Sequence, residues 1–103
     1  MIRHIVCWKF LDRAEGAPKA ENLRKAKAML DALPGRIPEI LSMEIGIDIT
    51  GGAASGDLVL SSSFATTATL EAYQAHPEHQ KVVPFLRAVQ SSKFVVDYEI
   101  PAP

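Results

Sequence analysis

Residues 41–49 read Leu-Ser-Met-Glu-Ile-Gly-Ile-Asp-Ile, with an apolar side chain at every odd position and a small or polar one at every even position. Side chains alternate between two faces along a β-strand, so this pattern predicts a strand over residues 40–49 with one buried face. A glycine-rich link over residues 50–56 follows, and residues 57–64 alternate again. The two strands are therefore expected to form an antiparallel hairpin.

Two more strands are predicted at the ends of the chain, over residues 2–11 and 93–100, where apolar residues again occupy every second position. Between the strands, apolar residues recur every three or four positions, which is the spacing of the buried face of a helix. Helices are accordingly predicted over residues 18–33, 67–75 and 77–91. Thr66 or Thr67 is expected to cap the second helix, and His76 to cap the third.

The resulting order, βαββαβ, predicts an α+β fold of the ferredoxin-like type, a four-stranded antiparallel sheet with its helices on one face. The other face of the sheet is also apolar. It is expected to present Ile5, Cys7, Val59 and Val95, together with the hydroxyls of Ser61 and Ser63. An exposed apolar sheet face marks an interface, so two copies are expected to pack sheet against sheet as a homodimer.

The chain has 103 residues, which suits a single domain over residues 1–103. Its 11 basic and 12 acidic residues give a formal net charge of −1, so no basic surface for nucleic acid is expected. The apolar runs are too short to span a membrane, and the first residues lack the pattern of a signal peptide. One cysteine excludes an internal disulfide. Together these features predict a cytoplasmic protein.

Chemistry is expected around residues 73–79, Tyr-Gln-Ala-His-Pro-Glu-His, which hold two of the three histidines of the chain. Histidine is the side chain that changes charge near neutral pH. In the first turn of a helix, His79 would stay neutral and could act as a general base, and Tyr73 could donate a hydrogen bond to a substrate carbonyl or enolate. A purely structural role is the alternative for both, since a buried tyrosine or histidine can simply pack and hydrogen-bond locally.

Several segments resemble the stress-responsive A/B barrel family, and together they cover nearly the whole chain. They are residues 2–10, residues 33–38 and 41–46, residues 70–80 with their Tyr-x-x-His-Pro-x-His pattern, and the closing residues 95–99, Val-Val-Asp-Tyr-Glu. The resemblance implies a dimeric α+β barrel. It leaves the activity open, because many members of the family have no assigned role and some are linked to stress.

A few plant members of this family are polyketide cyclases. In those enzymes a tyrosine and a histidine of the Tyr-x-x-His-Pro-x-His segment do acid–base work, and a histidine of the first strand lines the pocket. The matching residues here are Tyr73, His79 and His4. The cyclases use a further histidine early in the third strand, where this chain has Leu58. The resemblance therefore implies a cyclase-like site that lacks one polar group.

A ligand pocket is expected between the sheet and the helices, lined by His4, Trp8, Leu58, Tyr73, His79 and Phe94. No organic cofactor is expected. No metal ion is expected either, since His76 and His79 are separated by a proline and have no third ligand nearby in the sequence. Some relatives hold a cation with backbone carbonyls, and the matching stretch here contains Pro34, Ile37 and Ile40.

Three functions remain open from the sequence. The first is a stress-related dimer that binds a small apolar or polyketide-like molecule without chemistry. The second is a cofactor-free enzyme in which His79 removes a proton next to a carbonyl, Tyr73 stabilises the enolate, and an aldol or Claisen reaction closes a ring. The third, cofactor-free or haem-dependent oxygenation, rests on related dimeric barrels alone.

Overall fold

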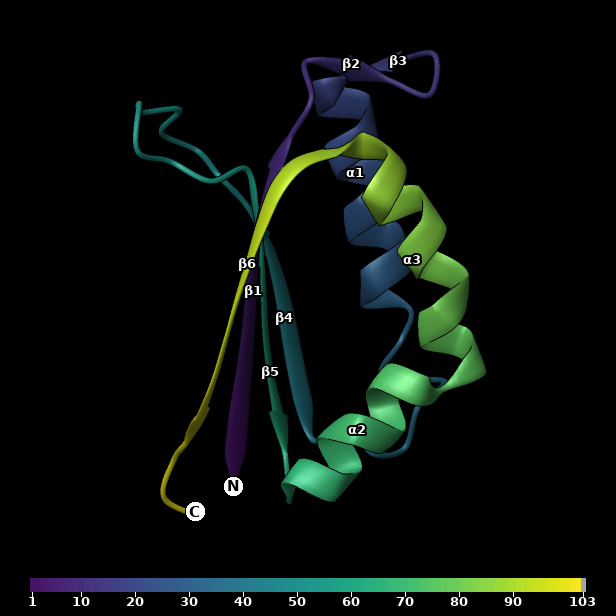
Figure 1. Cartoon of the computed structure of the whole chain (residues 1–103), viewed down its shortest axis with the longest axis vertical. Helices are drawn as coiled ribbons and strands as arrows, with labels where there is room; N and C mark the ends of the chain where they lie inside the picture. Colours follow the sequence, from purple (N-terminus) through teal and green to yellow (C-terminus); the bar gives the residue numbers. More distant parts are fainter. Residues whose placement is uncertain (103) are drawn as a thin grey trace.

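The computed structural model describes residues 1–102, and its main elements follow the predicted βαββαβ order (Figure 1). Four strands form one antiparallel sheet in the order β4-β5-β1-β6, with the bounds β1 (Ile2–Phe10), β4 (Ser42–Ile47), β5 (Leu58–Phe64) and β6 (Gln90–Glu99). Three helices cover one face of the sheet, α1 (Lys19–Asp31), α2 (Thr67–Ala75) and α3 (Pro77–Val89). The predicted ferredoxin-like fold is confirmed.

The loop predicted after the first strand contains a short β-hairpin whose strands have two residues each. It pairs β2 (Arg13–Ala14) with β3 (Ala17–Pro18). The two residues at its tip, Glu15 and Gly16, both have positive φ angles, 52° and 72°. Two consecutive positive φ values give the tight turn that matches the twist of the flanking strands. Strands of two residues are too short to show alternation of apolar and polar side chains, so no sequence pattern indicated this hairpin.

The boundary residues of the second and third helices agree with the sequence. The Thr66 hydroxyl accepts a hydrogen bond from the Thr69 amide at 3.2 Å, and the Thr69 hydroxyl accepts one from the Thr66 amide at 3.1 Å. The His76 Nδ1 accepts a hydrogen bond from the Glu78 amide at 3.1 Å, so this ring caps α3. These caps satisfy amides that have no partner inside a helix.

The hydrophobic core lies between the sheet and the helices. Trp8, Phe64 and Tyr73 are its large aromatic members, and each is at most 3% exposed. The core side of β1 is formed by the even positions, as predicted, and the buried side chains of α1 belong to the same core cluster.

The opposite face of the sheet has no helix over it, and six of its side chains form what we call the uncovered face: Ile5, Cys7, Val59, Phe94, Val96 and Tyr98. The prediction that Val95 lies on this face is wrong. In the antiparallel register Val95 pairs with Val6 and Phe94 pairs with Cys7, and directly paired residues share a face. Phe94 is consequently 71% exposed.

No helix within residues 1–102 is long and apolar enough to cross a membrane.

Candidate functional site

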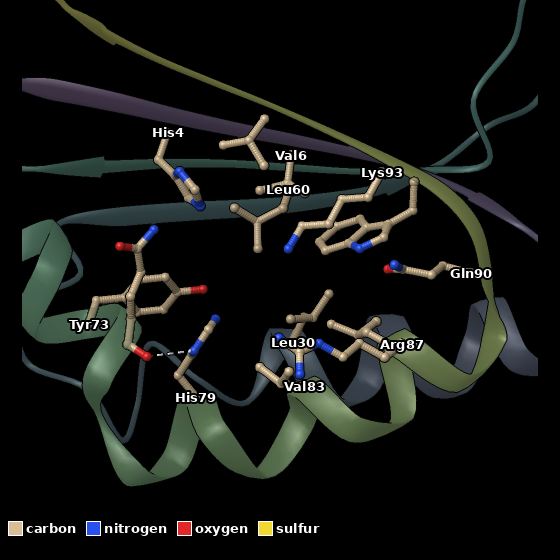
Figure 2. Close-up of a pocket in the computed structure, with 14 residues that line it drawn as sticks. His4, Val6, Leu30, Leu60, Tyr73, His79, Val83, Arg87, Gln90 and Lys93 are labelled. Atoms are coloured by element: carbon tan, nitrogen blue, oxygen red, sulfur yellow. Dashed lines mark hydrogen bonds between the residues drawn. The ribbon is translucent and has the colours of Figure 1, made fainter.

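A cavity of about 120 Å³ lies between the sheet and the helices (Figure 2). Its apolar lining consists of Val6, Leu30, Leu60, Val83, Leu86 and Val95. Its polar lining consists of His4, Trp8, Tyr73, Gln74, His79, Arg87, Gln90 and Lys93. A cavity that combines apolar walls with converging polar groups is a usual form of small-molecule site.

Tyr73 and His79 meet at this cavity because the chain turns sharply between two helices. α2 ends at Ala75, His76 has an extended backbone, and Pro77 begins α3. The turn places the His79 ring against the Tyr73 ring, with 4.6 Å between the ring centres. Both side chains point toward the cavity in Figure 2. The segment at residues 73–79 thus forms part of the cavity wall.

The protonation of His79 follows from its contacts. Its Nδ1 lies 3.0 Å from the Gln74 carbonyl oxygen, which can only accept a hydrogen bond (dashed line in Figure 2). Nδ1 therefore carries the proton, and Nε2 keeps its lone pair. Burial lowers the pKa of His79, the nearby Lys93 and His4 lower it further, and the hydrogen bond to Gln74 opposes them. The neutral ring can accept a proton on Nε2.

Tyr73 is a hydrogen-bond donor in this site. The residue is 1% exposed, and burial raises the pKa of its hydroxyl, so the group stays protonated across the physiological range. Its hydroxyl points into the cavity in Figure 2. A donor held beside a proton acceptor is the pair that enolisation of a carbonyl compound requires.

His4 faces Tyr73 from the sheet side and is fixed by Asp97. The His4 Nδ1 lies 2.5 Å from an Asp97 carboxylate oxygen, and the two residues pair directly across β1 and β6. The ring centres of His4 and Tyr73 are 6.2 Å apart. Asp97 was not among the site residues predicted from the sequence. The predicted βαββαβ order could have indicated it, because this order makes the first and last strands neighbours.

We expect an Asp97→Asn variant to release the His4 ring. The amide accepts a weaker hydrogen bond than the carboxylate, so the fraction of rings protonated on Nδ1 should fall. The free energy of unfolding should fall by about 1 kcal/mol, because Asp97 is 40% exposed and its hydrogen bond is partly replaced by water. Nitrogen-15 NMR of the imidazole reports the protonation site, and urea unfolding reports the stability.

The matched control for this variant is Glu99→Gln, two residues along the same strand, whose side chain does not contact the His4 ring. It should leave the His4 ring nitrogens unchanged. Identical ring spectra in the wild type and in Asp97→Asn would contradict the role of Asp97.

Two cationic side chains at the cavity were missed by the sequence analysis, and one predicted residue has a polar group whose role was not predicted. Arg87 and Lys93 extend toward the cavity from α3 and β6 (Figure 2). Trp8, whose place in the pocket was predicted, lines the cavity, and its indole N–H is buried and has no hydrogen-bond partner among residues 1–102. Arginine and lysine on a strand or helix usually face solvent, so the sequence held no signal for the two cations.

The structure brings His4, Trp8, Tyr73 and His79 together but does not bring Leu58 or Phe94 to this cavity. Leu58 lies on the helix side of the sheet, where it pairs with Trp8 and is buried in the core. Phe94 lies on the uncovered face, because its register partner is Cys7. Val95 takes the place on β6 that was expected for Phe94.

One of the three backbone carbonyls expected near a cation has a local contact. The Ile37 carbonyl accepts a hydrogen bond from the Ile40 amide at 3.3 Å, which closes a turn after α1. No group of three or more His, Cys, Asp or Glu side chains within residues 1–102 is placed to hold a metal ion. The cation therefore stays a prediction from the resemblance.

Two solved structures resemble the whole chain closely. A dimeric protein of unknown function with a ferredoxin-like fold from Bacteroides fragilis is 28% identical, with a TM-score of 0.83 over 96% of this chain and 95% of that one. A dimeric ferredoxin-like protein of unknown function from Thermobifida fusca is 22% identical, with a TM-score of 0.83 over 96% of this chain and 90% of that one. Both support the fold, and both neighbours are dimers.

Enzymes are also found among the similar structures. The hydroxynitrile lyase from Passiflora edulis is 20% identical, with a TM-score of 0.76 over 99% of this chain and 94% of that one. Identity at this level supports the fold alone. No curated protein sequence matches the chain.

The sequence profile of the stress-responsive A/B barrel domain matches residues 2–100, nearly the full length. The chain belongs to the stress-responsive A/B barrel domain family.

Proposed function

We propose that this chain binds a small carbonyl-containing molecule in the cavity between its sheet and its helices. The observation that carries the proposal is Trp8, a residue 3% exposed that lines the cavity and whose buried indole N–H has no hydrogen-bond partner within residues 1–102. A buried donor without a partner is destabilising by about 1–3 kcal/mol. The oxygen of a bound ligand would remove that penalty, and Tyr73 offers a second donor.

The size of the cavity limits the ligand. Its volume of about 120 Å³ is slightly below the roughly 150 Å³ of an apolar cavity that binds benzene. A molecule with a short carbon chain, or the ketone end of a slightly longer one, therefore fits. A longer polyketide-like molecule would place only its reacting end inside, and the rest would extend past the cavity mouth.

A second function, acid–base catalysis on the bound ketone, is favoured by the proton arrangement of His79. The Nε2 lone pair would take a proton from the carbon next to the carbonyl, which leaves an enolate and an imidazolium. Tyr73 would donate a hydrogen bond to the enolate oxygen. In one outcome the imidazolium returns the proton to the carbon. In the other, the enolate carbon attacks a second carbonyl of the same ligand and closes a ring, and the alkoxide formed from that carbonyl takes the proton from the imidazolium.

Both proposals are tested with one neutral ketone, 5-methylhexan-2-one. Amide NMR of the isotope-labelled protein detects binding as saturable shifts of the resonances around Tyr73 and His79. Proton NMR of the ketone in heavy water detects catalysis as loss of the signals next to its carbonyl, relative to buffer alone. Shifts without exchange support binding only.

Absence of any saturable shift at the cavity, with this ketone and with its carboxylate counterpart 4-oxopentanoate alike, would overturn the binding proposal, and with it the catalytic one. Exchange no faster than in buffer, with binding intact, would overturn catalysis alone. The two proposals therefore fail separately in the same sample.

The homodimer is part of the same proposal, and its support is the uncovered face. Val59, Phe94, Val96 and Tyr98 are between 40% and 71% exposed in the single chain, and they lie on two strands of one sheet face. Exposed apolar surface of this kind is uncommon in monomers. The dimeric neighbours of the same fold point to a second copy of the chain as the occupant.

We expect Val96→Asp to convert the dimer to a monomer. Val96 is 57% exposed in the single chain, so the substitution changes the folding of one subunit little but places a charge at the centre of the proposed interface. Light scattering after size exclusion measures the mass. Ala28→Asp adds the same charge on the exposed side of α1 and should stay dimeric. A wild-type mass of one subunit, 11.2 kDa, would contradict the dimer.

A further inference from the structure

We propose that the ligand carries a negatively charged group, most simply a carboxylate, so that the substrate class is a small keto acid. The inference rests on the proposed function, because it names the ligand of the same cavity. The observation that carries it is a pair of cationic side chains, Arg87 and Lys93. They line the cavity together with Tyr73, the proposed hydrogen-bond donor to the ligand carbonyl.

The charges at the cavity are unbalanced. Arg87 and Lys93 both line it, and no Asp or Glu side chain does. Neither cation has an ion-pair partner in the part of the chain from residue 1 to residue 102, where the other ion pairs use Lys19, Lys27, Arg36 and Lys81. This local excess of positive charge stands in a chain whose formal net charge is −1. A cavity lined by one sign of charge concentrates ligands of the opposite sign.

The hydrogen-bonding groups of the cavity point to the same ligand. Tyr73 supplies an O–H donor, the lining residue Trp8 has an unpartnered indole N–H, and Arg87 and Lys93 supply charged donors. His79 Nε2 supplies a free acceptor. A ligand with several oxygen acceptors and few donors matches this set. A carboxylate is such a group, and it binds arginine and lysine with strong charge-assisted hydrogen bonds.

The positions of these groups orient the ligand. Figure 2 shows His4, Tyr73 and His79 at one end of the cavity and Arg87 with Gln90 toward the other, while Lys93 reaches in from β6. A keto acid would therefore place its ketone beside Tyr73 and His79 and its carboxylate toward Arg87 and Lys93. The carboxylate end would fix which carbon faces the His79 ring.

The test compares two ligands with the same number of non-hydrogen atoms, 4-oxopentanoate and 5-methylhexan-2-one. Both keep the methyl ketone, and only the first has a carboxylate in place of a branched alkyl end. Amide NMR titrations give the two dissociation constants. We expect 4-oxopentanoate to bind roughly tenfold more tightly, although it is the less apolar ligand. Raising the salt concentration should reduce the preference.

The variants Lys93→Gln and Arg87→Gln should each reduce the preference, and the double variant should abolish it. Lys81→Gln is the matched control, because Lys81 is an exposed cation of α3 that pairs with Glu78 away from the cavity. It should keep the full preference. All these side chains are exposed, so the variants are expected to fold.

Equal or tighter binding of the neutral ketone would overturn the keto acid inference and leave the proposed ligand cavity intact. A preference that survives in the double variant would also overturn it. Failure of both ligands to bind would overturn the proposed function and the inference together.

Discussion

Replacement of His79 by alanine is expected to slow proton exchange of a bound ketone by about 10²–10⁴-fold, the usual contribution of a positioned general base. The expectation rests on the arrangement of the ring. Nδ1 donates to the Gln74 carbonyl at 3.0 Å, so Nε2 is the free acceptor at the cavity, next to Tyr73. Proton NMR of 5-methylhexan-2-one in heavy water measures the rate.

His76→Asn is the matched control for this prediction. His76 is the other histidine of the same turn, but it caps α3 and does not line the cavity. Asparagine is a good N-cap, so the helix should be kept while an imidazole is lost. The exchange rate should stay close to that of the wild type. An equal loss of rate in both variants would contradict a specific role for His79. Partial rescue of His79→Ala by added imidazole would support one.

The pH dependence gives the same prediction a second readout. The neutral imidazole is the base, so the rate should fall as the pH falls through the pKa of His79. Burial lowers that pKa below its ordinary value of 6.5. The acid limb should therefore have its midpoint below pH 6.5, and it should be missing in His79→Ala. A midpoint above 6.5, or a limb that persists in the variant, would contradict the assignment.

The elements of the fold could be predicted because their signals are local. Alternation over residues 41–49 and 57–64 identified the central hairpin, and the structure contains strands at Ser42–Ile47 and Leu58–Phe64. The Pro77 break and the Thr66 cap marked the bounds of α2 within one residue. Each of these signals depends on neighbours a few positions away. One helical layer and four strands then left few topologies to choose from.

The side of the sheet that each residue of the last strand faces could not be predicted in the same way. Alternation divides Phe94, Val95 and Val96 into two sets but does not say which set faces the helices. The usual rule is that the more apolar set is buried, and here it fails because the uncovered face is also apolar. Phe94 and Val96 lie on that face, and Val95 reaches the cavity.

Which residues line the cavity also depends on contacts between distant parts of the chain, and local sequence patterns do not show these contacts. Leu58 was placed correctly on the helix side of the sheet, but it is packed in the core and does not line this cavity. Asp97 and Lys93 reach the site because β6 pairs with β1 along its whole length. Their positions follow from the strand register, which depends on residues more than 80 positions apart in the chain.

Phe64 is a core aromatic side chain that packs against Tyr73 and His4 of the site, so a stability change at that position also tests the cavity. We expect Phe64→Ala to lower the free energy of unfolding by about 3–5 kcal/mol. Phe64 is 0% exposed, its ring centre lies 5.1 Å from that of Tyr73, and it lies 6.4 Å from that of His4. The loss is large compared with the roughly 5–15 kcal/mol that stabilises a whole domain. Urea unfolding at a fixed protein concentration measures it.

Phe85→Ala gives the matched comparison, since it removes the same side chain where it is only partly buried. Phe85 lies on α3 with the Lys25 ammonium 4.6 Å from its ring centre, and it packs at the edge of the core. Its loss should reduce the free energy of unfolding by about 1–2 kcal/mol, because less apolar surface returns to water. Equal losses at the two positions would contradict the placement of Phe64 in the core. In Phe64→Ala the Tyr73 ring also loses its support from the sheet, so the orientation of its hydroxyl should become less fixed. Ketone binding should then weaken in Phe64→Ala and not in Phe85→Ala, whose ring lies outside the cavity lining.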